Sequence, residues 1–239
     1  MTLITGQHAI EEALKAEQAI DRLILAQNKK KTPAIHALIT QARAQGVKVQ
    51  FQSANILEQN YPEAAQTGIV AIVQSVPLAD IADINVDTDP FILIVDHVED
   101  PYNFGAMLRS AEIFGVTAVV FPKDRNGQLT PGVMKAASGA TAHLKLIRVT
   151  NIAKTIPTLK EKGYWIYGAD ANEGEPLHQA RLNYPAAVVA GNESKGISRL
   201  VSKSCDAHLK IPSIGKTDSL NVSVAMGVIF YQFSLQRPD

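Results

Sequence analysis

The feature that most constrains this chain is a series of short apolar runs in its last 150 residues. The runs are five or six residues long and occupy 91–96, 118–122, 144–149, 165–169, 186–191 and 207–212. Helical patterns separate several of them, and a long final helix is expected over residues 219–236. Strands buried on both faces have such near-continuous apolar sequences. The pattern therefore predicts an α/β fold, with a mostly parallel sheet covered by helices on both faces.

The first part of the chain predicts a smaller α/β domain. Helix-like segments at 9–16 and 34–46 alternate with strand-like segments at 22–26, 48–51 and 68–73. An acidic stretch bracketed by prolines follows, and it holds four aspartates and no basic residue: Asp80, Asp83, Asp87 and Asp89. Such a composition is typical of a linker. We therefore expect a domain at residues 1–75, a linker at 76–89 and a second domain at 90–239.

Composition indicates a globular protein of a reducing compartment. With 239 residues and 46% hydrophobic content, the chain can bury a large core. Cys205 is the only cysteine, which excludes a disulfide framework and the usual cysteine-based metal sites. Glu11 and Glu12 lie where a signal peptide would need an apolar stretch, and no apolar run reaches the ~18 residues of a membrane span. We expect a cytoplasmic protein without a membrane segment.

The charge of the chain does not predict nucleic-acid binding. The formal net charge is zero, which argues against a strongly basic nucleic-acid binder. Lysines 29, 30 and 31 form one basic cluster in the first domain. Such a cluster is more often a solvated face than a binding site, and both interpretations stay open.

The first segment with chemical character is DHVEDPYNFGAMLRSAEIFG, at residues 96–115. Its strand ends at Asp96, Asn103 is a plausible N-cap, and Gly105 allows a close approach of backbone in the first helical turn. Arg109 lies about one turn beyond Gly105 on nearly the same face. A plain capped helix, with Arg109 paired to Glu112, explains this segment equally well.

The second segment is VVAGNESKGIS, at residues 188–198. A buried strand breaks at Gly191 into a loop that holds Glu193 and Gly196. Glycines around one carboxylate suggest tight backbone geometry beside a ligand, although an ordinary turn with a solvated Glu193 has the same pattern. The spacing is not the GxGxxG of a dinucleotide site.

The third segment is IPSIGKTDSLNVSVA, at residues 211–225. A strand ends at Ile211, and a glycine-containing loop leads to the head of the last helix. Asp218 or Ser219 is a candidate N-cap, but a cap alone does not explain the polar cluster of Ser219, Asn221 and Ser223 on an otherwise apolar helix.

Together the three segments resemble the three motifs of the SpoU/TrmH family of RNA 2′-O-ribose methyltransferases, in the family's order and near its spacing. The likeness covers essentially all of residues 90–239. The opening, from GQHAIEEAL to TGIVAIV, resembles the ribosomal-protein-L30-like substrate-binding domain of the family's ribosomal RNA branch. The resemblance therefore implies a transferase that methylates a ribose 2′-hydroxyl, with a guanosine of 23S ribosomal RNA as the expected target.

The resemblance also implies a C-terminal trefoil knot that holds S-adenosylmethionine, a homodimer, and no metal. The residues at the family's cofactor positions are Gly191, Ile211 and Leu220. Those at its catalytic positions are Asn103, Arg109, Glu193, Ser219 and Asn221. His97 departs from the small residue expected beside the site, and it receives no catalytic role. The same chemistry on transfer RNA, and a non-catalytic RNA-binding protein on the same fold, remain as alternatives.

Two physical arguments refine these expectations. A guanidinium stays protonated in proteins, so Arg109 is expected to hold a substrate phosphate and stabilise the developing alkoxide, while a substrate phosphate or water takes the proton. Asn103 is expected to orient either Arg109 or the ribose. The last helix has apolar or small residues on every side, including Val224, Met226 and Ile229. Such a helix must be covered all round, and a second copy of the chain is the expected cover, with burial inside the monomer as the alternative.

Overall fold

The computed structural model describes residues 2–15, 20–30, 32–73, 77–123, 129–216 and 219–238. The chain divides into two compact units, Met1–Val76 and Pro77–Asp239, and each is described by itself. Lys31 of the basic cluster and Asp218 of the third segment lie outside the described residues. None of the helices within these ranges is long and apolar enough to cross a membrane.

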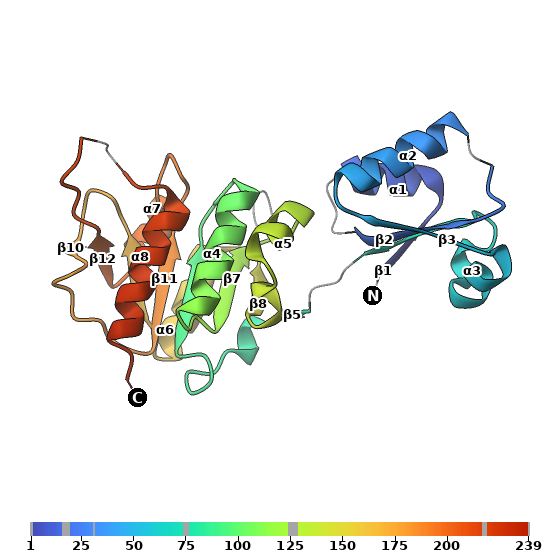
Figure 1. Cartoon of the computed structure of the whole chain (residues 1–239). Coiled ribbons are helices and arrows are strands. Elements are labelled where there is room, and N and C mark those ends of the chain that lie inside the picture. The colour runs from blue at the N-terminus through green and yellow to red at the C-terminus, as the bar shows by residue number, and fades with distance from the viewer. Residues whose placement is uncertain are drawn as a thin grey trace. The chain divides into compact units, whose positions relative to one another are not determined.

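The first unit is a four-stranded sheet with helices on both faces, as Figure 1 shows. The strand order is β1-β4-β2-β3, with β2 and β3 parallel and the other pairs antiparallel. Separate apolar clusters lie against α1 and α2 and against α3, so the small α/β domain expected from the sequence is confirmed. Its elements are β1 (Thr2–Thr5), α1 (Gln7–Lys15), β2 (Ile20–Ala26), α2 (Pro33–Ala44), β3 (Lys48–Gln52), α3 (Ala54–Asn60), the 3₁₀ turn η1 (Pro62–Ala64) and β4 (Ile69–Val73).

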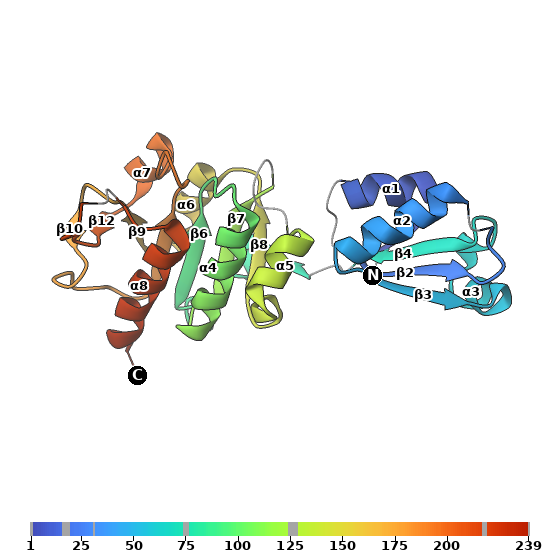
Figure 2. The same cartoon turned by 45° about the horizontal axis from the view of Figure 1, so that its top comes forward.

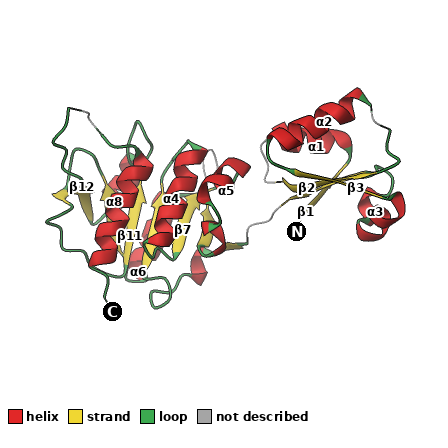
Figure 3. Cartoon of the chain, viewed as in Figure 1, coloured by secondary structure: helices red, strands yellow, loops and turns green. Residues whose placement is uncertain are grey.

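The second unit contains an eight-stranded sheet in which every strand pair is parallel. The strand order is β10-β12-β9-β11-β6-β7-β8-β5. All residues of the central strands β6, β7 and β11 are buried, because helices cover both faces of the sheet, which confirms the expected fold class (Figure 3). The strands are β5 (Leu78–Ala79), β6 (Phe91–Val95), β7 (Ala118–Pro122), β8 (Lys145–Val149), β9 (Trp165–Ala169), β10 (Glu175–Pro176), β11 (Ala186–Ala190) and β12 (Ala207–Lys210).

The helices of this unit divide between the two faces. On one face, α4 (Pro101–Ile113) lies between α5 (Pro131–Ala137) and α8 (Val222–Leu235), as seen in Figure 2. On the other, α6 (Ile152–Glu161) and α7 (Arg199–Ser204) bury apolar side chains against the sheet. The 3₁₀ turns are η2 (Ile81–Asp83) and η3 (Ala140–Ala142). The trefoil knot implied by the resemblance stays a prediction.

The acidic stretch expected to be a linker belongs instead to the second unit from residue 77 onwards. Strand β5 pairs with β8, and Asp80 and Asp83 form a capping box around η2. Asp89 is buried and accepts a hydrogen bond from Nζ of Lys145 at 2.5 Å. Asp80, Asp83 and Asp89 therefore have structural partners. The partner of Asp89 lies 56 residues away, where a local composition pattern cannot detect it.

The last helix is shorter and more asymmetric than expected. It begins at Val222, and one side of it is buried within the chain through Met226, Ile229, Phe230 and Phe233. Phe233 stacks on Phe91 of β6 with ring centroids 4.7 Å apart. Ile229 is therefore a core residue of the single chain and needs no second copy to cover it. The side left exposed is a separate stripe of four residues: Val224, Val228, Tyr231 and Leu235.

Candidate active site

Three loops meet at one edge of the large sheet. They follow β6, β11 and β12, and because these strands are parallel their carboxyl ends lie at the same edge. The three loops carry the three segments that the sequence analysis singled out. The tertiary fold therefore brings the first segment together with residues that lie 90 and 118 positions further along the chain.

The first loop ends in a helix cap. Oδ1 of Asp100 accepts hydrogen bonds from the backbone N–H groups of Tyr102, at 2.7 Å, and of Asn103, at 3.4 Å. Pro101 occupies the first helical position, where a missing N–H has no cost. The expectation that Asn103 is the N-cap is therefore wrong, because the preceding aspartate already satisfies the free donors. Consequently the Asn103 side chain is available for other partners.

Asn103 links the three segments in one chain of hydrogen bonds. Its Nδ2 donates to Oε1 of Glu193 at 3.2 Å, and its Oδ1 accepts from Nδ2 of Asn221 at 3.0 Å. Glu193 also accepts from the backbone N–H groups of Glu99 and Asp100, each at 3.3 Å. The carboxylate thus holds the loop that follows β6 against the loop that follows β11.

Asn221 has two roles at the head of α8. Its Oδ1 accepts from the backbone N–H groups of Ser223 and Val224, so it is the N-cap that the sequence analysis assigned to Asp218 or Ser219. Because the oxygen faces the helix, the amide nitrogen must face away, toward Asn103. The cap therefore fixes the orientation of the donor. Ser219 lies exposed in the preceding loop.

Two glycines shape the loop after β11. A Cβ atom at Gly191 would lie 2.3 Å from the carbonyl carbon of Gly196, which is too close for any side chain. Gly196 has φ of +66°, in the region that favours glycine. Asn192 and Gly196 exchange two backbone hydrogen bonds at 2.9 Å, which close the loop and hold Glu193 at its tip.

Asp96 and His97 join the first two loops and were not identified as a pair from the sequence. Asp96 is fully buried; its Oδ2 accepts from the backbone N–H of Ser198 at 2.7 Å, and its Oδ1 lies 2.6 Å from Nδ1 of His97. His97 adopts φ of +61°, which is rare for a residue other than glycine. Its carbonyl oxygen accepts from Nδ2 of Asn192 at 2.9 Å. The only sequence signal was an acid directly after a buried strand.

Arg109 lies apart from this chain of hydrogen bonds. Six residues on a helix of 3.6 residues per turn place Asn103 and Arg109 about 120° apart around α4. Within the described residues, Arg109 makes no hydrogen bond or ion pair, so neither an orienting contact from Asn103 nor the alternative pair with Glu112 is present. Its exposed guanidinium is free to meet a ligand from solvent.

The residues at the family's cofactor positions lie at the ends of β11 and β12 and just before α8, and they differ in exposure. Gly191 lies at the end of β11, and Ile211 is partly buried at the end of β12. Leu220 is 50% exposed, and Ile214 in the same loop is fully exposed. Exposed apolar side chains suit the faces of the adenine ring of S-adenosylmethionine, and the backbone N–H and C=O groups of the loops suit its polar edges. Among the described residues, no group of three or more His, Cys, Asp or Glu is arranged to hold a metal ion.

Comparisons with known families match both units. Residues 90–231 match the model described as the SpoU rRNA Methylase family, and residues 3–79 match that described as RNA 2′-O ribose methyltransferase substrate binding. A Bacillus subtilis (strain 168) protein called "Putative TrmH family tRNA/rRNA methyltransferase YacO" is 37% identical over 239 residues, which cover 98% of this chain and 95% of that protein.

Two solved structures illustrate the structural similarity. The SpoU methyltransferase AviRb from Streptomyces viridochromogenes, in complex with the cofactor AdoMet, covers 98% of this chain and 89% of its own, at 22% identity and a TM-score of 0.65. The A. aeolicus TrmH/SpoU tRNA modifying enzyme covers 63% of this chain and 76% of its own, at 27% identity and a TM-score of 0.55.

Proposed function

This chain belongs to the SpoU rRNA methylase family, and from that premise we propose that it transfers a methyl group from S-adenosylmethionine to the ribose 2′-hydroxyl of a guanosine in 23S ribosomal RNA. The family is dependent on S-adenosylmethionine. The observation that carries the proposal is the chain of hydrogen bonds from Asn221 through Asn103 to Glu193, which unites all three motifs at one edge of the sheet.

The first unit supports ribosomal RNA over transfer RNA. It matches the model described as RNA 2′-O ribose methyltransferase substrate binding. The A. aeolicus transfer RNA enzyme is similar over only 63% of this chain. The name of the Bacillus relative covers both substrates, so transfer RNA stays the second candidate. Lys30, the exposed described lysine of the basic cluster, is available to RNA, whereas Lys29 donates to the carbonyl oxygen of Thr67 at 2.5 Å.

The reaction requires an in-line displacement, so the protein must align the hydroxyl nucleophile and stabilise the charge that develops on it. Bound S-adenosylmethionine supplies a methyl group on a positively charged sulfur. Gly191, Ile211 and Leu220 are the residues proposed to hold it, largely through their backbone. Glu193 already receives three hydrogen bonds, and we assign it the role of a positioning residue that holds the first two loops together.

Arg109 is proposed to act on the RNA rather than as a base. A guanidinium remains protonated in proteins, so it cannot accept the proton of the hydroxyl. Its exposed fork of donors suits a phosphate of the target nucleotide and the developing alkoxide. A phosphate oxygen or a water molecule then takes the proton. Asn103 and Asn221 keep the neighbouring loops in register, and Ser219, exposed beside them, is proposed to contact the substrate.

We also propose that the chain works as a homodimer. The exposed stripe on α8 has the spacing of one helical face, and neighbouring α4 exposes Tyr102 and Ile113. The rings of Phe114 and Tyr231 lie 5.7 Å apart and make the apolar surface continuous between the two helices. Soluble monomers rarely expose such a patch, and a second copy would cover it beside Arg109. We propose a cytoplasmic location for the dimer, where ribosomal RNA is available.

The proposed function is tested by incubating the purified protein with labelled S-adenosylmethionine and total RNA. We expect label in 23S ribosomal RNA, at one guanosine, in an alkali-resistant 2′-O-methylated form. A 2′-deoxy analogue at that position removes the nucleophile and should accept no methyl group. Label in transfer RNA would support the second candidate. RNA binding without saturable uptake of the cofactor would indicate a protein without catalytic activity.

A further inference from the structure

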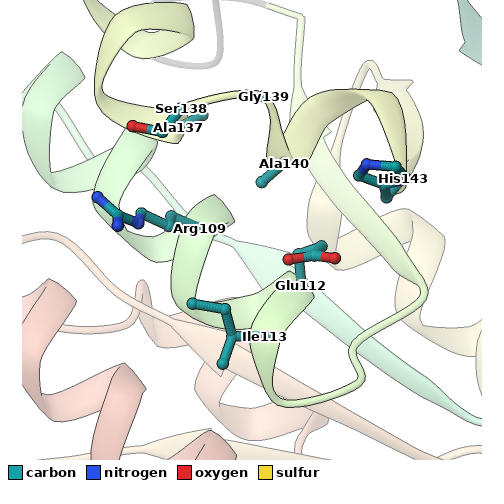
Figure 4. Close-up of a pocket in the computed structure, with 8 residues that line it drawn as sticks. All are labelled: Arg109, Glu112, Ile113, Ala137, Ser138, Gly139, Ala140 and His143. Atoms are coloured by element: carbon teal, nitrogen blue, oxygen red, sulfur yellow. The ribbon is translucent and has the colours of Figure 1, made fainter.

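Beyond the three loops, α4 lines a cavity of about 260 Å³. Its opposite wall is the segment from Ala137 to His143, which leads from α5 into η3 (Figure 4). Ser138 and Gly139 both adopt positive φ, of +50° and +94°, and turn the chain so that this wall faces α4. The volume is slightly below that of typical ligand pockets and suits a single planar ring system.

The cavity holds a carboxylate that the fold does not use. Glu112 is partly buried, yet within the part of the chain that the structure describes its side chain receives no hydrogen bond and no cation. Arg109, one turn earlier, is likewise without a partner in that part. Figure 4 shows the two side chains leaving α4 in different directions, with Glu112 beneath Ala140 and near His143. A partly buried carboxylate with both oxygens unused can accept hydrogen bonds from a ligand that presents two N–H groups.

We propose that this cavity takes the base of the target guanosine and that Glu112 reads its Watson–Crick edge. This inference rests on the proposed function. Guanine presents the N1–H and N2–H₂ donors side by side, and a carboxylate offers two acceptor oxygens. Adenine and cytosine present an unprotonated ring nitrogen at the corresponding position, which a carboxylate repels. Uracil offers one N–H between two carbonyl oxygens.

The other walls of the cavity fit the same ligand. Ile113 is exposed and offers apolar surface to one face of a purine ring, while the buried Ala137 and Ala140 line the cavity behind it. His143 is exposed at the rim, where an imidazole can stack on a base. Arg109 extends from the same wall and would reach the phosphate of the nucleotide whose base Glu112 holds. One turn of α4 thus supplies a carboxylate, Glu112, for the base and a guanidinium, Arg109, for the phosphate of the same guanosine nucleotide.

The test uses Glu112→Gln, which keeps the shape of the side chain and replaces one acceptor oxygen with a donor. Synthetic RNA fragments carry guanosine or inosine at the methylated position, and inosine retains N1–H but lacks the N2 amino group. Glu161→Gln is the matched control, because Glu161 is exposed on α6 at the opposite face of the sheet. Both kcat/KM and the Kd for S-adenosylmethionine are measured for each variant.

We expect Glu112→Gln to lower kcat/KM on guanosine by roughly 10- to 100-fold, the usual effect of a hydrogen bond to a charged group, with cofactor affinity unchanged. On RNA with inosine, the wild type should already have a low kcat/KM. Glu112→Gln should lower kcat/KM on this substrate much less than on guanosine. Glu112→Asp should restore part of the preference for guanosine, and Glu161→Gln should match the wild type.

Two outcomes would overturn the inference alone: an active wild type that methylates inosine as fast as guanosine, or a Glu112→Gln variant that slows both substrates equally. A wild type that transfers no methyl group to RNA carrying guanosine would overturn the proposed function, and this inference with it.

Discussion

Asn221 donates its side-chain amide to the amide oxygen of Asn103 at 3.0 Å, across 118 residues of chain. The donor is oriented because the oxygen of the same amide caps α8. This donor fixes the orientation of the Asn103 amide, so that the nitrogen of Asn103 donates to Glu193. The position of each loop in the site therefore depends on the other two.

Substitutions of Asn221 distinguish its role as the cap of α8 from its hydrogen bond to Asn103. Asn221→Asp keeps a good helix cap, but its second carboxylate oxygen would repel Oδ1 of Asn103. A flip of the Asn103 amide would not relieve this, because Oδ1 of Asn103 would then face the carboxylate of Glu193. We expect methyl transfer to fall by roughly a hundredfold, as on loss of one oriented donor at an active site, while Tm stays nearly constant. Asn221→Ala should lose about 1 kcal/mol of stability as well. Steady-state kinetics and thermal unfolding of both variants measure the two effects. Full activity of Asn221→Asp would show that the hydrogen bond to Asn103 is not needed for methyl transfer.

Arg109→Ala should abolish methyl transfer and leave cofactor binding nearly intact, because the proposed cofactor loops come from the other two segments. The loss should be on the order of a hundredfold or more. Arg109→Lys is the control: it keeps the charge but loses the fork that binds phosphate, so it should recover only part of the rate. Single-turnover rates and calorimetry with S-adenosylmethionine separate the two effects. A parallel loss of cofactor binding would mean that Arg109 is structural.

A charge on the exposed stripe of α8 should weaken the proposed dimer. Val228 is 40% exposed, so Val228→Glu should fold and sediment as a monomer. Leu200→Glu is the matched control, because Leu200 is an exposed apolar residue on α7 at the other face of the sheet, and this variant should remain dimeric. Sedimentation velocity at low micromolar concentration provides the measurement. A fully active wild-type monomer at that concentration would reject the dimer.

A truncated chain that begins at Pro77 should fold and bind cofactor, because it is a compact unit with an apolar core cluster built from its own residues. Its use of ribosomal RNA should fall strongly, since the first unit is the proposed RNA-binding part. Circular dichroism, calorimetry and methyl transfer to 23S ribosomal RNA are compared with those of the full chain. Equal transfer by the truncated chain would contradict the role of residues 1–75.

The stability of the protein should fall in alkaline solution. Burial raises the pKa of the Cys205 thiol from its ordinary value of 9.0 to about 12, and that of Tyr184 from 10.0 to about 12. Because the folded values are the higher ones, the stabilisation is fully present below about pH 9 and is lost as pH rises toward 12. Denaturant titrations across this range should show a smaller decline for Cys205→Ala than for the wild type. An identical decline would mean that the thiol does not contribute.

The sequence by itself determined the layered architecture and the edge at which the site lies. Strands buried on both faces must be apolar along their whole length, so the runs at 91–96 and 186–191 were recognisable without any contact being known. Parallel strands end at one edge, and this brought Asn103, Glu193 and Asn221 into one neighbourhood before their bonds were visible.

The tertiary structure alone decided which partners those residues have. Asp100 and Asn103 are equally good caps by residue type, and only the backbone path selects Asp100. The local sequence around Asp89 is typical of a linker, and only the fold shows that Asp89 is buried and bound to Lys145. In the same way, packing on the sheet decides which side of α8 is buried. Sequence patterns report local periodicity, whereas hydrogen bonds and burial depend on residues distant in the chain. The place of Glu112 in a cavity wall opposite Ala140 and His143 therefore became visible only in three dimensions.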